Sequence, residues 1–328
     1  MKKVRIAVIG CGRIGQMHAK NIQLHEKTTL ACVFDPNDKF AKKVSNDLNV
    51  PAVEKVDEVF SDSGVDAILI SSPTNTHIDF IEKSVAAKKP VLCEKPIDLD
   101  IIKVNECSDR LKGNVIPIQL GFNRRFDPGH QAAKQSLIDG EIGELHQCLI
   151  TSRDPGLPSW DYLKVSGGQF RDMTIHDFDL ARFMLGEEPE KIFAISNALI
   201  NPKIKSELND SDTLMIILET SSGKQCHINN SRSATYGYDQ RVEVHGSKGS
   251  LKVNNPTLSE IELAKEAGTT KDRLHHFFMT RYIDAYKNQI DYFVDCIKKR
   301  SMPKPDSYDG YYALYLACLL YTSDAADE

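Results

Sequence analysis

The sequence predicts an α/β protein in which an N-terminal doubly wound parallel sheet precedes an α/β domain with an open, mostly antiparallel sheet. Three observations support this fold class. The chain has 328 residues, enough for two domains at roughly 100–200 residues each. Short apolar runs alternate with helical patterns as far as about residue 120. From about residue 145 the candidate strands are longer and alternate apolar with polar residues. The change near residue 123 places the expected domains at 1–122 and 123–328.

The first domain is expected to alternate strands with helices. Its strand candidates are apolar on both faces, as parallel strands covered by helices are. These strand candidates cover residues 3–10, 28–35, 66–73, 90–96 and 115–122, and the helical patterns between them cover 15–25, 39–49, 77–88 and 100–113. The connections are short, as βα units require.

The second domain is expected to carry longer strands and hairpins. Strand candidates cover residues 144–154, 190–200, 212–234 and 240–255. The last two ranges contain the turn signals "SSGK" and "GSKGS", which indicate hairpins. Two helices are expected, one around 167–179 and one through 269–300. In the second, Phe278, Tyr282, Tyr286, Phe293 and Ile297 lie near one helical stripe, which we interpret as core packing.

The composition is that of an ordinary globular protein. Hydrophobic residues make up 41% of the chain and charged residues 27%, with a formal net charge of −5. An acidic balance argues against a nucleic-acid partner, and no apolar run is long enough to span a bilayer. The apolar run after the basic N-terminus is too short for a signal peptide and leads into glycines. Eight scattered cysteines without a CxxC pair indicate reduced thiols in a cytoplasmic protein.

A glycine-rich loop follows the first strand. Gly10-Cys11-Gly12-Arg13-Ile14-Gly15 has the spacing GxGxxG and stands between a strand and a helix. In such a loop the first glycine allows a tight turn, the second lets the backbone approach a pyrophosphate, and the third lets helix and strand pack closely. The helix N-terminus then binds the anion. Asp35 closes the second strand, twenty residues beyond Gly15, and completes the pattern for dinucleotide binding.

Asp35 also predicts which dinucleotide binds. A carboxylate at this position accepts hydrogen bonds from the adenosine ribose and repels a 2′-phosphate. Residues 36–38 are Pro, Asn and Asp, with no arginine to bind such a phosphate. The sequence therefore favours NAD over NADP.

Two further motifs follow the third and fourth strands. One is Ser71-Ser72-Pro73-Thr74-Asn75-Thr76-His77, and the other is Glu94-Lys95-Pro96. Ligands of open α/β sheets bind at the carboxyl ends of the strands. His77 is interpreted as a loop contact near the cofactor rather than as a catalytic residue.

The stretch "GGQFRDMTIHDFD", residues 167–179, concentrates polar residues on a helical pattern. Asp172, His176 and Asp179 have the spacing i, i+4, i+7, which places them on one face of an α-helix. Gly167 and Gly168 precede them and allow either a close approach of the backbone to a ligand or a simple turn. From these residues alone, a catalytic group, a metal site and an ordinary polar helix face all stay open.

With these motifs in the order "GCGRIG", "SSPTNTH", "CEKP", "GFNRRFD" and "GGQFRDMTIHDFDLARF", the chain resembles the Gfo/Idh/MocA family of NAD(P)-dependent oxidoreductases over nearly its whole length. Within the family it looks most similar to inositol 2-dehydrogenases. The resemblance implies a Rossmann domain and an α/β domain with an open sheet, on which members often form dimers or tetramers. It implies Lys95 at the reaction centre, Asp172 and His176 as catalytic partners, and Arg125, Asp179 and Tyr236 as substrate contacts.

The expected reaction is NAD-dependent oxidation of myo-inositol to its 2-keto product. His176 is the natural base, because an imidazole with an unperturbed pKa near 6.5 is available in neutral form at pH 7. Lys95 donates to the substrate oxygen, and Asp172 orients the imidazole or binds a hydroxyl. Arg124 is interpreted as a surface charge.

The expected contacts are numerous. Cofactor contacts are expected at Gly10, Gly12, Arg13, Ile14, Gly15, Asp35, Ser72, Pro73, Thr74, Asn75, His77, Glu94 and Lys95. Substrate contacts are expected at Lys95, Arg125, Arg153, Asp154, Asp172, His176, Asp179 and Tyr236. No metal is expected, and the partners are a small polyol and further copies of the chain.

Other functions predict different behaviour. A dehydrogenase for another inositol isomer or a pyranose sugar shares the catalytic set and differs in its pocket. A non-catalytic NAD-binding regulator predicts loss of Lys95 or His176, and both are present. A metal-dependent hydrolase or lyase predicts inhibition by chelators. The ending "YTSDAADE" departs from the family pattern, and we expect its eight residues to be poorly ordered and truncated or foreign.

Overall fold

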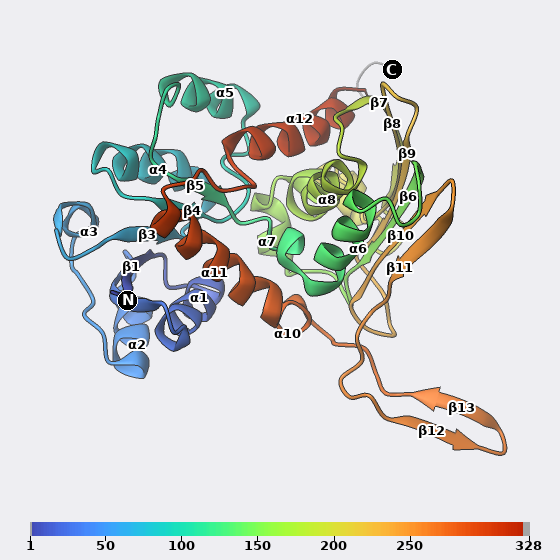
Figure 1. Cartoon of the computed structure of the whole chain (residues 1–328), viewed down its shortest axis with the longest axis horizontal. Helices are drawn as coiled ribbons and strands as arrows, with labels where there is room; N and C mark the ends of the chain where they lie inside the picture. The colour runs from blue at the N-terminus through green and yellow to red at the C-terminus, as the bar shows by residue number, and fades with distance from the viewer. Residues whose placement is uncertain (1, 324–328) are drawn as a thin grey trace. The chain divides into compact units, whose positions relative to one another are not determined.

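A computed structural model describes residues 2–323 and divides them into two compact units (Figure 1). The first unit comprises residues 2–123 and 285–315, and the second comprises 124–284 and 316–323. This division differs from the expected boundaries of 1–122 and 123–328, because a C-terminal segment packs with the N-terminal one. None of the helices within 2–323 has the length and apolar character needed to cross a membrane.

The first unit alternates strands and helices, as predicted. Its elements up to residue 120 are β1 (Val4–Ile9), α1 (Arg13–Leu24), β2 (Thr28–Phe34), α2 (Asp38–Leu48), α3 (Val56–Ser61), β3 (Ala67–Ile70), η1 (Thr74–Thr76), α4 (His77–Ala86), β4 (Val91–Cys93), α5 (Ile101–Arg110) and β5 (Ile118–Leu120). The five strands form one parallel sheet in the order β2-β1-β3-β4-β5. The predicted doubly wound parallel sheet is therefore confirmed.

Local chemistry explains where the helices of this unit begin and end. The side chain of Asn37 caps α2 by accepting the Lys39 N–H, and Asp100 caps α5 by accepting the Ile102 N–H. Helix α2 ends at Asn49, which has a φ of 51° in the left-handed region that asparagine tolerates. Strands β3 and β4 are fully buried, in agreement with their uninterrupted apolar sequences.

The helix α11 (Ile283–Lys299) belongs to the core of the first unit for almost its whole length. Ile290, Phe293 and Val294 lie in the same apolar cluster as residues of β1, β2 and β3. The Gln289 amide donates to the carbonyl of Leu120 at the end of β5. Of the predicted stripe, Phe293 and Ile297 therefore pack in the core of the N-terminal sheet, whereas Phe278 and Tyr282 belong to the second unit.

The second unit is built on a six-stranded sheet. Its elements are η2 (Asn123–Phe126), α6 (Pro128–Ile138), β6 (Leu145–Arg153), α7 (Trp160–Val165), η3 (Phe170–Thr174), α8 (Ile175–Leu185), β7 (Pro189–Asn197), α9 (Lys203–Leu208), β8 (Thr213–Thr220), β9 (Gln225–Ser231), β10 (Asp239–Gly246), β11 (Gly249–Val253), β12 (Glu262–Lys265), β13 (Gly268–Lys271) and α10 (Phe278–Arg281). The strand order is β11-β10-β6-β9-β8-β7. Only β6 and β9 pair in parallel, so the predicted open, mostly antiparallel sheet is confirmed.

The two faces of this sheet have different environments. Along β8 the residues alternate between buried and exposed positions, as expected for a sheet covered on one side. The covered face packs against α8, which contacts β6 and β9 (Figure 1). The opposite face carries exposed apolar side chains on β7 and β8, including Phe193 and Ile217.

The predicted helix through 269–300 is wrong in its first part. Residues 268–271 form β13, which pairs with β12 in a two-stranded ribbon whose residues are all exposed (Figure 1). Helices α10 and α11 begin only at Phe278 and Ile283. The last helix, α12, covers Ser307–Ser323, so the first three residues of the ending expected to be disordered are helical. The remaining five, 324–328, lie outside the described residues.

Candidate active site

The glycine loop after β1 has the geometry of a phosphate-binding turn. Gly10 has a φ of +95°, and a Cβ there would lie 2.5 Å from the backbone nitrogen of Ser72. A Cβ on Gly15 would lie 1.8 Å from the carbonyl oxygen of Gly10. Both glycines are therefore required by the packing of the turn itself.

Gly12 is the exception, because a Cβ at this position would meet no described protein atom within 4 Å. Internal packing does not explain this glycine, whereas the close approach of a ligand phosphate does. Gly12 is also the N-cap of the 12-residue helix α1, and its position gives no side-chain cap to the amides of the first turn. These amides fit an anionic group such as a pyrophosphate.

Asp35 lies directly after β2 and joins this strand to the glycine loop. Its Oδ2 accepts the Cys11 N–H at 2.7 Å, and its Oδ1 accepts the Asn37 N–H at 2.8 Å. The carboxylate is therefore held beside the loop, where a ribose bound against the same turn would meet it. This arrangement fits the predicted NAD preference.

The loops after β3 and β4 are joined to each other by His77. Burial lowers the pKa of His77, although backbone hydrogen bonds and nearby carboxylates oppose this shift. Its two ring nitrogens lie 2.7 Å from the carbonyl oxygen of Pro96 and 2.9 Å from that of Ser72. His77 therefore lies between the loops that contain Ser72 and Lys95, and because a neutral imidazole carries a single N–H, it donates to only one of the two carbonyls at a time. Its interpretation as a loop contact near the cofactor rather than a catalytic residue stays a prediction.

The other predicted residues of these loops differ in their surroundings. Glu94 is engaged within the unit, since its Oε1 accepts the Nε2–H of the buried His18 at 2.7 Å. The Ser72 hydroxyl donates to the Thr76 hydroxyl at 2.6 Å, while Pro73 and Asn75 are exposed. Lys95 is partly buried and follows β4 by two residues. Contact of these residues with a cofactor stays a prediction.

The stretch 167–179 does not form one continuous α-helix. Residues 170–174 form a π-helical turn, η3, and the α-helix α8 begins at Ile175. Asp172 lies in the π turn, so the regular α-helical spacing assumed for Asp172, His176 and Asp179 does not hold at its first residue. Gly167 and Gly168 both have a φ of +84°, which supports the simpler interpretation that the turn itself requires glycine. Single π turns occur frequently at functional sites.

Asp172 is bound by side chains from two other elements. Its Oδ1 accepts the hydroxyl of Tyr162 at 2.7 Å, and its Oδ2 accepts Nη2–H of Arg232 at 3.2 Å. Asp154 lies in the same electrostatic environment. Burial raises the pKa of Asp154 to about 6; the positive charge of Arg232 lowers it and the negative charge of Asp172 raises it. Two residues absent from the sequence prediction, Tyr162 and Arg232, thus belong to this cluster.

Asp179 and Arg125 bind each other. The Arg125 Nε–H and Nη2–H donate to the two oxygens of Asp179 at 2.8 and 2.7 Å, a bidentate pair. Asp179 is only 1% exposed. The pair therefore fixes η2 to α8, and the direct contact of both residues with a substrate stays a prediction.

Arg153 and Tyr236 meet at the end of the sheet where the parallel strands β6 and β9 finish. The Arg153 Nη1–H donates to the Tyr236 hydroxyl at 2.9 Å, and this hydroxyl donates to Asp239 at 2.7 Å. Arg232 and Asp154 follow β9 and β6 at the same end. Five polar residues thus lie at this end of the second unit's sheet, namely Arg153, Asp154, Arg232, Tyr236 and Asp239.

Arg124 lies in a buried polar network, so its interpretation as a surface charge is wrong. Arg124 Nη1–H donates to Oδ1 of Asp177 at 2.5 Å, and Nη2–H donates to the Ser152 hydroxyl at 3.1 Å. The amide of Asn230 donates to the other oxygen of Asp177 at 2.9 Å. Burial raises the pKa of Asp177, and the charge of Arg124 opposes this shift. The network joins η2, β6 and β9 to α8 at Asp177, the residue that follows His176.

Within residues 2–323, no cluster of three or more His, Cys, Asp and Glu side chains is arranged to hold a metal ion. Of the three residues weighed above as an alternative metal set, Asp172 binds Tyr162 and Arg232, and Asp179 binds Arg125.

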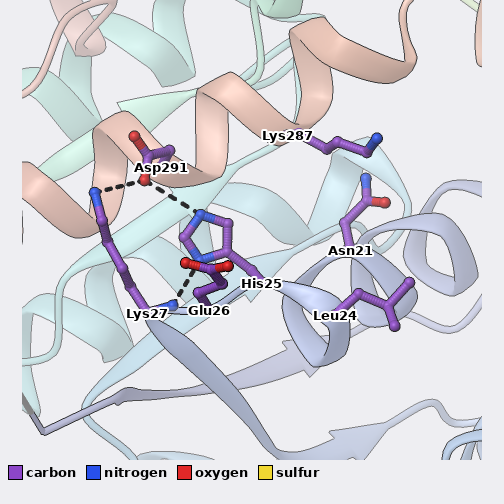
Figure 2. Close-up of a pocket in the computed structure, with 7 residues that line it drawn as sticks. All are labelled: Asn21, Leu24, His25, Glu26, Lys27, Lys287 and Asp291. Carbon is purple, nitrogen blue, oxygen red and sulfur yellow. Dashed lines mark hydrogen bonds and ion pairs between the residues drawn. The ribbon is translucent and has the colours of Figure 1, made fainter.

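A hollow of about 290 Å³ in the first unit lies at the C-terminal end of α1, at the opposite end of this helix from Gly12 (Figure 2). It is lined by Asn21, Leu24, His25, Glu26, Lys27, Lys287 and Asp291. Lys27 and His25 both pair with Asp291, at 2.7 and 3.3 Å. No residue of the predicted site lines this hollow.

Comparison with protein families gives two matches that together cover most of the chain. Residues 4–121 match the oxidoreductase family with an NAD-binding Rossmann fold, and residues 130–252 match the GFO/IDH/MocA C-terminal domain. The first match ends within two residues of β5, and the second contains η3, α8 and all six strands of the larger sheet except the last residue of β11.

Individual relatives are similar to this chain in sequence and structure over almost their full length. The chain is 46% identical to the inositol 2-dehydrogenase of Rhizobium meliloti, over 96% of this chain and 94% of that protein. A myo-inositol dehydrogenase of Corynebacterium glutamicum has a crystal structure that matches with a TM-score of 0.94 and 40% identity, over 98% and 96% of the two chains. The scyllo-inositol dehydrogenase of Lactobacillus casei, crystallised with NAD(H) and scyllo-inositol, matches with a TM-score of 0.89 and 28% identity over 97% and 95%.

Proposed function

The chain belongs to the Gfo/Idh/MocA family of oxidoreductases, and on this premise we propose that it oxidises myo-inositol to 2-keto-myo-inositol (scyllo-inosose) with NAD as cofactor. The observation that carries the proposal is the 46% identity over 314 residues to a relative named inositol 2-dehydrogenase. The chain keeps the lysine, aspartate and histidine that the resemblance assigns to catalysis, at positions 95, 172 and 176.

The NAD site is proposed in the glycine loop and the loops after β3 and β4. Gly12, the amides at the start of α1 and the carboxylate of Asp35 would hold the pyrophosphate and the adenosine ribose. The remaining predicted cofactor contacts stay part of the proposal, which is supported by the position of His77 between the loops that carry Ser72 and Lys95. The assignment of residues 1–122 to NAD binding and of 123–328 to substrate binding and subunit contacts stays part of the proposal, with the segment 285–315 packing in the unit of the NAD-binding residues.

We propose that Lys95, Asp172 and His176 act on one substrate hydroxyl. Bound NAD supplies the acceptor for the hydride that leaves the substrate carbon with its bonding electrons. An imidazole nitrogen of His176 takes the hydroxyl proton, while the ammonium group of Lys95 donates to the same oxygen as the carbonyl forms. The carboxylate of Asp172 stabilises the imidazolium that results. The alcohol is thus converted to a ketone, its hydride passes to NAD and its hydroxyl proton passes to His176.

The ring hydroxyls of a polyol need several further partners. Arg153 and Tyr236 are the best placed of the predicted contacts, because both are partly exposed at the sheet edge that also carries Asp154. Arg125 and Asp179 are proposed to support this region through their mutual pair, with Asp179 buried beneath it.

The proposal predicts that NADH forms fastest from myo-inositol. Initial rates of NADH formation are measured for a panel of inositol isomers and aldopyranoses, with NAD and NADP in parallel and with EDTA in one series. The expected result is oxidation of myo-inositol with NAD, unchanged by EDTA. Failure to oxidise any inositol would contradict the proposed substrate class, and a preference for NADP would contradict the role given to Asp35.

A second substrate is favoured by one comparison. The matching Lactobacillus casei structure is of a scyllo-inositol dehydrogenase. The substrate scyllo-inositol differs from myo-inositol only in the configuration of the reacting carbon. The same panel decides between the two isomers, because a higher kcat/KM for scyllo-inositol would assign the chain to the second function.

We also propose that the chain forms a homo-oligomer, a tetramer built from sheet-to-sheet dimers. The uncovered face of the six-stranded sheet presents Phe193, Ile195, Met215 and Ile217, which are 63, 65, 54 and 46% exposed. These residues are cross-strand neighbours, since Phe193 pairs with Ile217 and Ile195 with Met215. Soluble monomers rarely expose contiguous apolar patches of this kind, and a second copy of the same face is the proposed occupant.

The substitution Ile217→Glu is expected to convert the oligomer to a smaller species, because it places a charge in the centre of the apolar contact. Size-exclusion chromatography with light scattering measures the change in mass. Leu24→Glu is the matched control, since Leu24 is 72% exposed but lies on α1, outside the sheet. A monomeric wild-type protein, or an unchanged mass for Ile217→Glu, would rule out this interface.

A cytoplasmic location and a role in myo-inositol catabolism complete the proposal. All eight cysteines are free thiols, and seven of them are buried. Burial raises the pKa of Cys11 and of Cys107 to about 12, so these groups stay protonated and unreactive at neutral pH. Reduced, inert thiols are typical of cytoplasmic proteins.

A further inference from the structure

The carboxylate of Asp172 is held from two sides by residues that neither the sequence patterns nor the proposed mechanism include. Tyr162, on the short helix α7, donates its hydroxyl to Oδ1 at 2.7 Å. Arg232, directly after β9, donates Nη2–H to Oδ2 at 3.2 Å. Each oxygen of the carboxylate therefore has its own donor, and the two donors come from different elements. Two such bonds fix the plane of the carboxylate as well as its position.

The backbone around Asp172 makes this restraint necessary. Residues 170–174 form a π turn, which widens the helix and removes the regular α-helical spacing that would otherwise set the direction of the side chain. The turn is anchored at its start by Asp210, whose two carboxylate oxygens accept the Gln169 N–H at 2.9 and 3.1 Å. The direction of the Asp172 carboxylate is then determined mainly by the groups that bind it.

Arg232 is a buried cation, and neighbouring carboxylates offset the free-energy cost of removing its charge from water. Its side chain is 1% exposed. Burial lowers the pKa of Arg232, but the charges of Asp172, Asp154 and Asp210 together raise it above its ordinary value. A buried guanidinium surrounded by three carboxylates stays charged, so it supplies a fixed positive charge next to Asp172.

Tyr162 complements this charge with a neutral donor. Burial and the negative charge of Asp172 both raise the pKa of the Tyr162 hydroxyl well above its ordinary value. The hydroxyl therefore keeps its proton at neutral pH and can donate to Asp172. Helix α7 is itself held by the Ser159 side chain, which accepts the Tyr162 N–H.

We propose that Tyr162 and Arg232 are positioning residues that orient the carboxylate of Asp172 toward His176 for the oxidation step. This inference rests on the proposed function, in which Asp172 stabilises the imidazolium formed on His176. Neither Tyr162 nor Arg232 touches the reacting atoms in this scheme. Their contribution is to preorganise a charge that would otherwise rotate in a widened turn.

The test is a double-mutant cycle between Tyr162→Phe and Asp172→Asn. Tyr162→Phe removes a single hydroxyl and keeps the ring, and it is expected to lower kcat roughly 10-fold, within the range that small misplacements of a catalytic group produce, with little change in KM. In the Asp172→Asn background the same change is expected to have no further effect on kcat, because Tyr162 acts through Asp172. Equal losses in both backgrounds would overturn the proposal.

Two further variants separate positioning from simple support of the fold. Arg232→Lys keeps the charge and is expected to retain more kcat than Arg232→Met. Tyr315→Phe, which removes a surface hydroxyl on α12, is the matched control for Tyr162→Phe and is expected to leave kcat unchanged. A Tyr162→Phe protein with reduced NADH affinity and full kcat would contradict the assignment, because it would show a structural effect elsewhere.

A third measurement keeps this inference separate from the proposed substrate. The four proteins of the cycle are also unfolded in urea, and the coupling between positions 162 and 172 is calculated from their free energies of unfolding. If the wild type oxidises no polyol, the proposed function fails, while a measurable coupling still supports the contact. If the free energies of unfolding show no coupling between positions 162 and 172, the positioning role is overturned whatever the substrate is.

Discussion

Replacement of His176 by alanine is expected to lower kcat for myo-inositol oxidation by roughly 10²–10⁴-fold, the contribution typical of a positioned general base. No other group in the proposed scheme accepts the hydroxyl proton, so without the imidazole the proton must leave to water. The affinity for NADH is expected to stay unchanged, because the proposed cofactor residues lie in the glycine loop and the loops after β3 and β4. Steady-state rates of NADH formation and a fluorescence titration with NADH measure the two quantities.

The matched control for this substitution is His276→Ala. His276 is exposed and lies in the segment before α10, outside the proposed site. Its removal is expected to leave both kcat and NADH affinity unchanged. A His176→Ala protein that keeps more than a tenth of the wild-type kcat would contradict the assignment of the base. A wild-type protein that binds NADH but turns over no polyol would instead favour the non-catalytic regulator.

The sequence predicted those parts of the fold and of the proposed site that depend on local geometry. The order of the motifs and the change from short apolar runs to alternating strands predicted both sheets, because these patterns follow from the side-chain periods of buried and half-buried strands. The glycine spacing predicted the turn after β1, since packing at Gly10 and Gly15 excludes any larger residue. These features depend on local geometry, which the sequence specifies directly.

The π turn at 170–174 could not be predicted in the same way. A spacing of i, i+4, i+7 describes an α-helix equally well whether or not one turn is widened. The widening depends on distant partners, such as Asp210 at Gln169 and Arg232 at Asp172. Tyr162 and Arg232 were missed for the same reason, because they lie 10 and 60 residues from Asp172 and belong to no motif.

Long-range packing also explains the differences in the C-terminal third. The helical pattern in 269–300 is strong enough in α11 to be recognised, but its first residues belong to strand β13 of the two-stranded ribbon. Gly268, with a φ of +121°, marks the turn of this ribbon and was the available signal. That α11 packs into the first unit cannot be read from its amphipathic pattern, which shows that a face is buried but not against which sheet.

Arg124 illustrates a further limit, since a charged residue beside Arg125 resembles a surface residue until its partner is known. Asp177 lies between the predicted residues His176 and Asp179, yet its side chain faces the sheet. A buried carboxylate must find a charged or hydrogen-bonding partner, and Asp177 finds Arg124 and Asn230. The pair therefore has a large expected effect on stability, although it contributes no atom to the proposed reaction.

Asp177→Ala is expected to lower the free energy of unfolding by about 3–5 kcal/mol, the typical cost of removing one partner of a buried ion pair. The side chains of Asp177 and Arg124 are 0% and 5% exposed, so the guanidinium left behind has almost no access to water. It also keeps a bond only to the Ser152 hydroxyl among the partners described above. Unfolding in urea, followed by circular dichroism, measures the loss.

The contrasting control is Glu219→Ala, which removes one partner of the exposed pair between Lys191 and Glu219 on the antiparallel strands β7 and β8. Exposed pairs contribute about 0.2–1 kcal/mol, because water replaces the lost partner. A loss below about 1 kcal/mol for Asp177→Ala, equal to that of the control, would mean that water reaches Arg124 and that the network around Asp177 is open to solvent. A loss several times larger than the control would show that the ion pair between Asp177 and Arg124 is shielded from water. Helix α8 could then not move away from the sheet without separating these two buried charges.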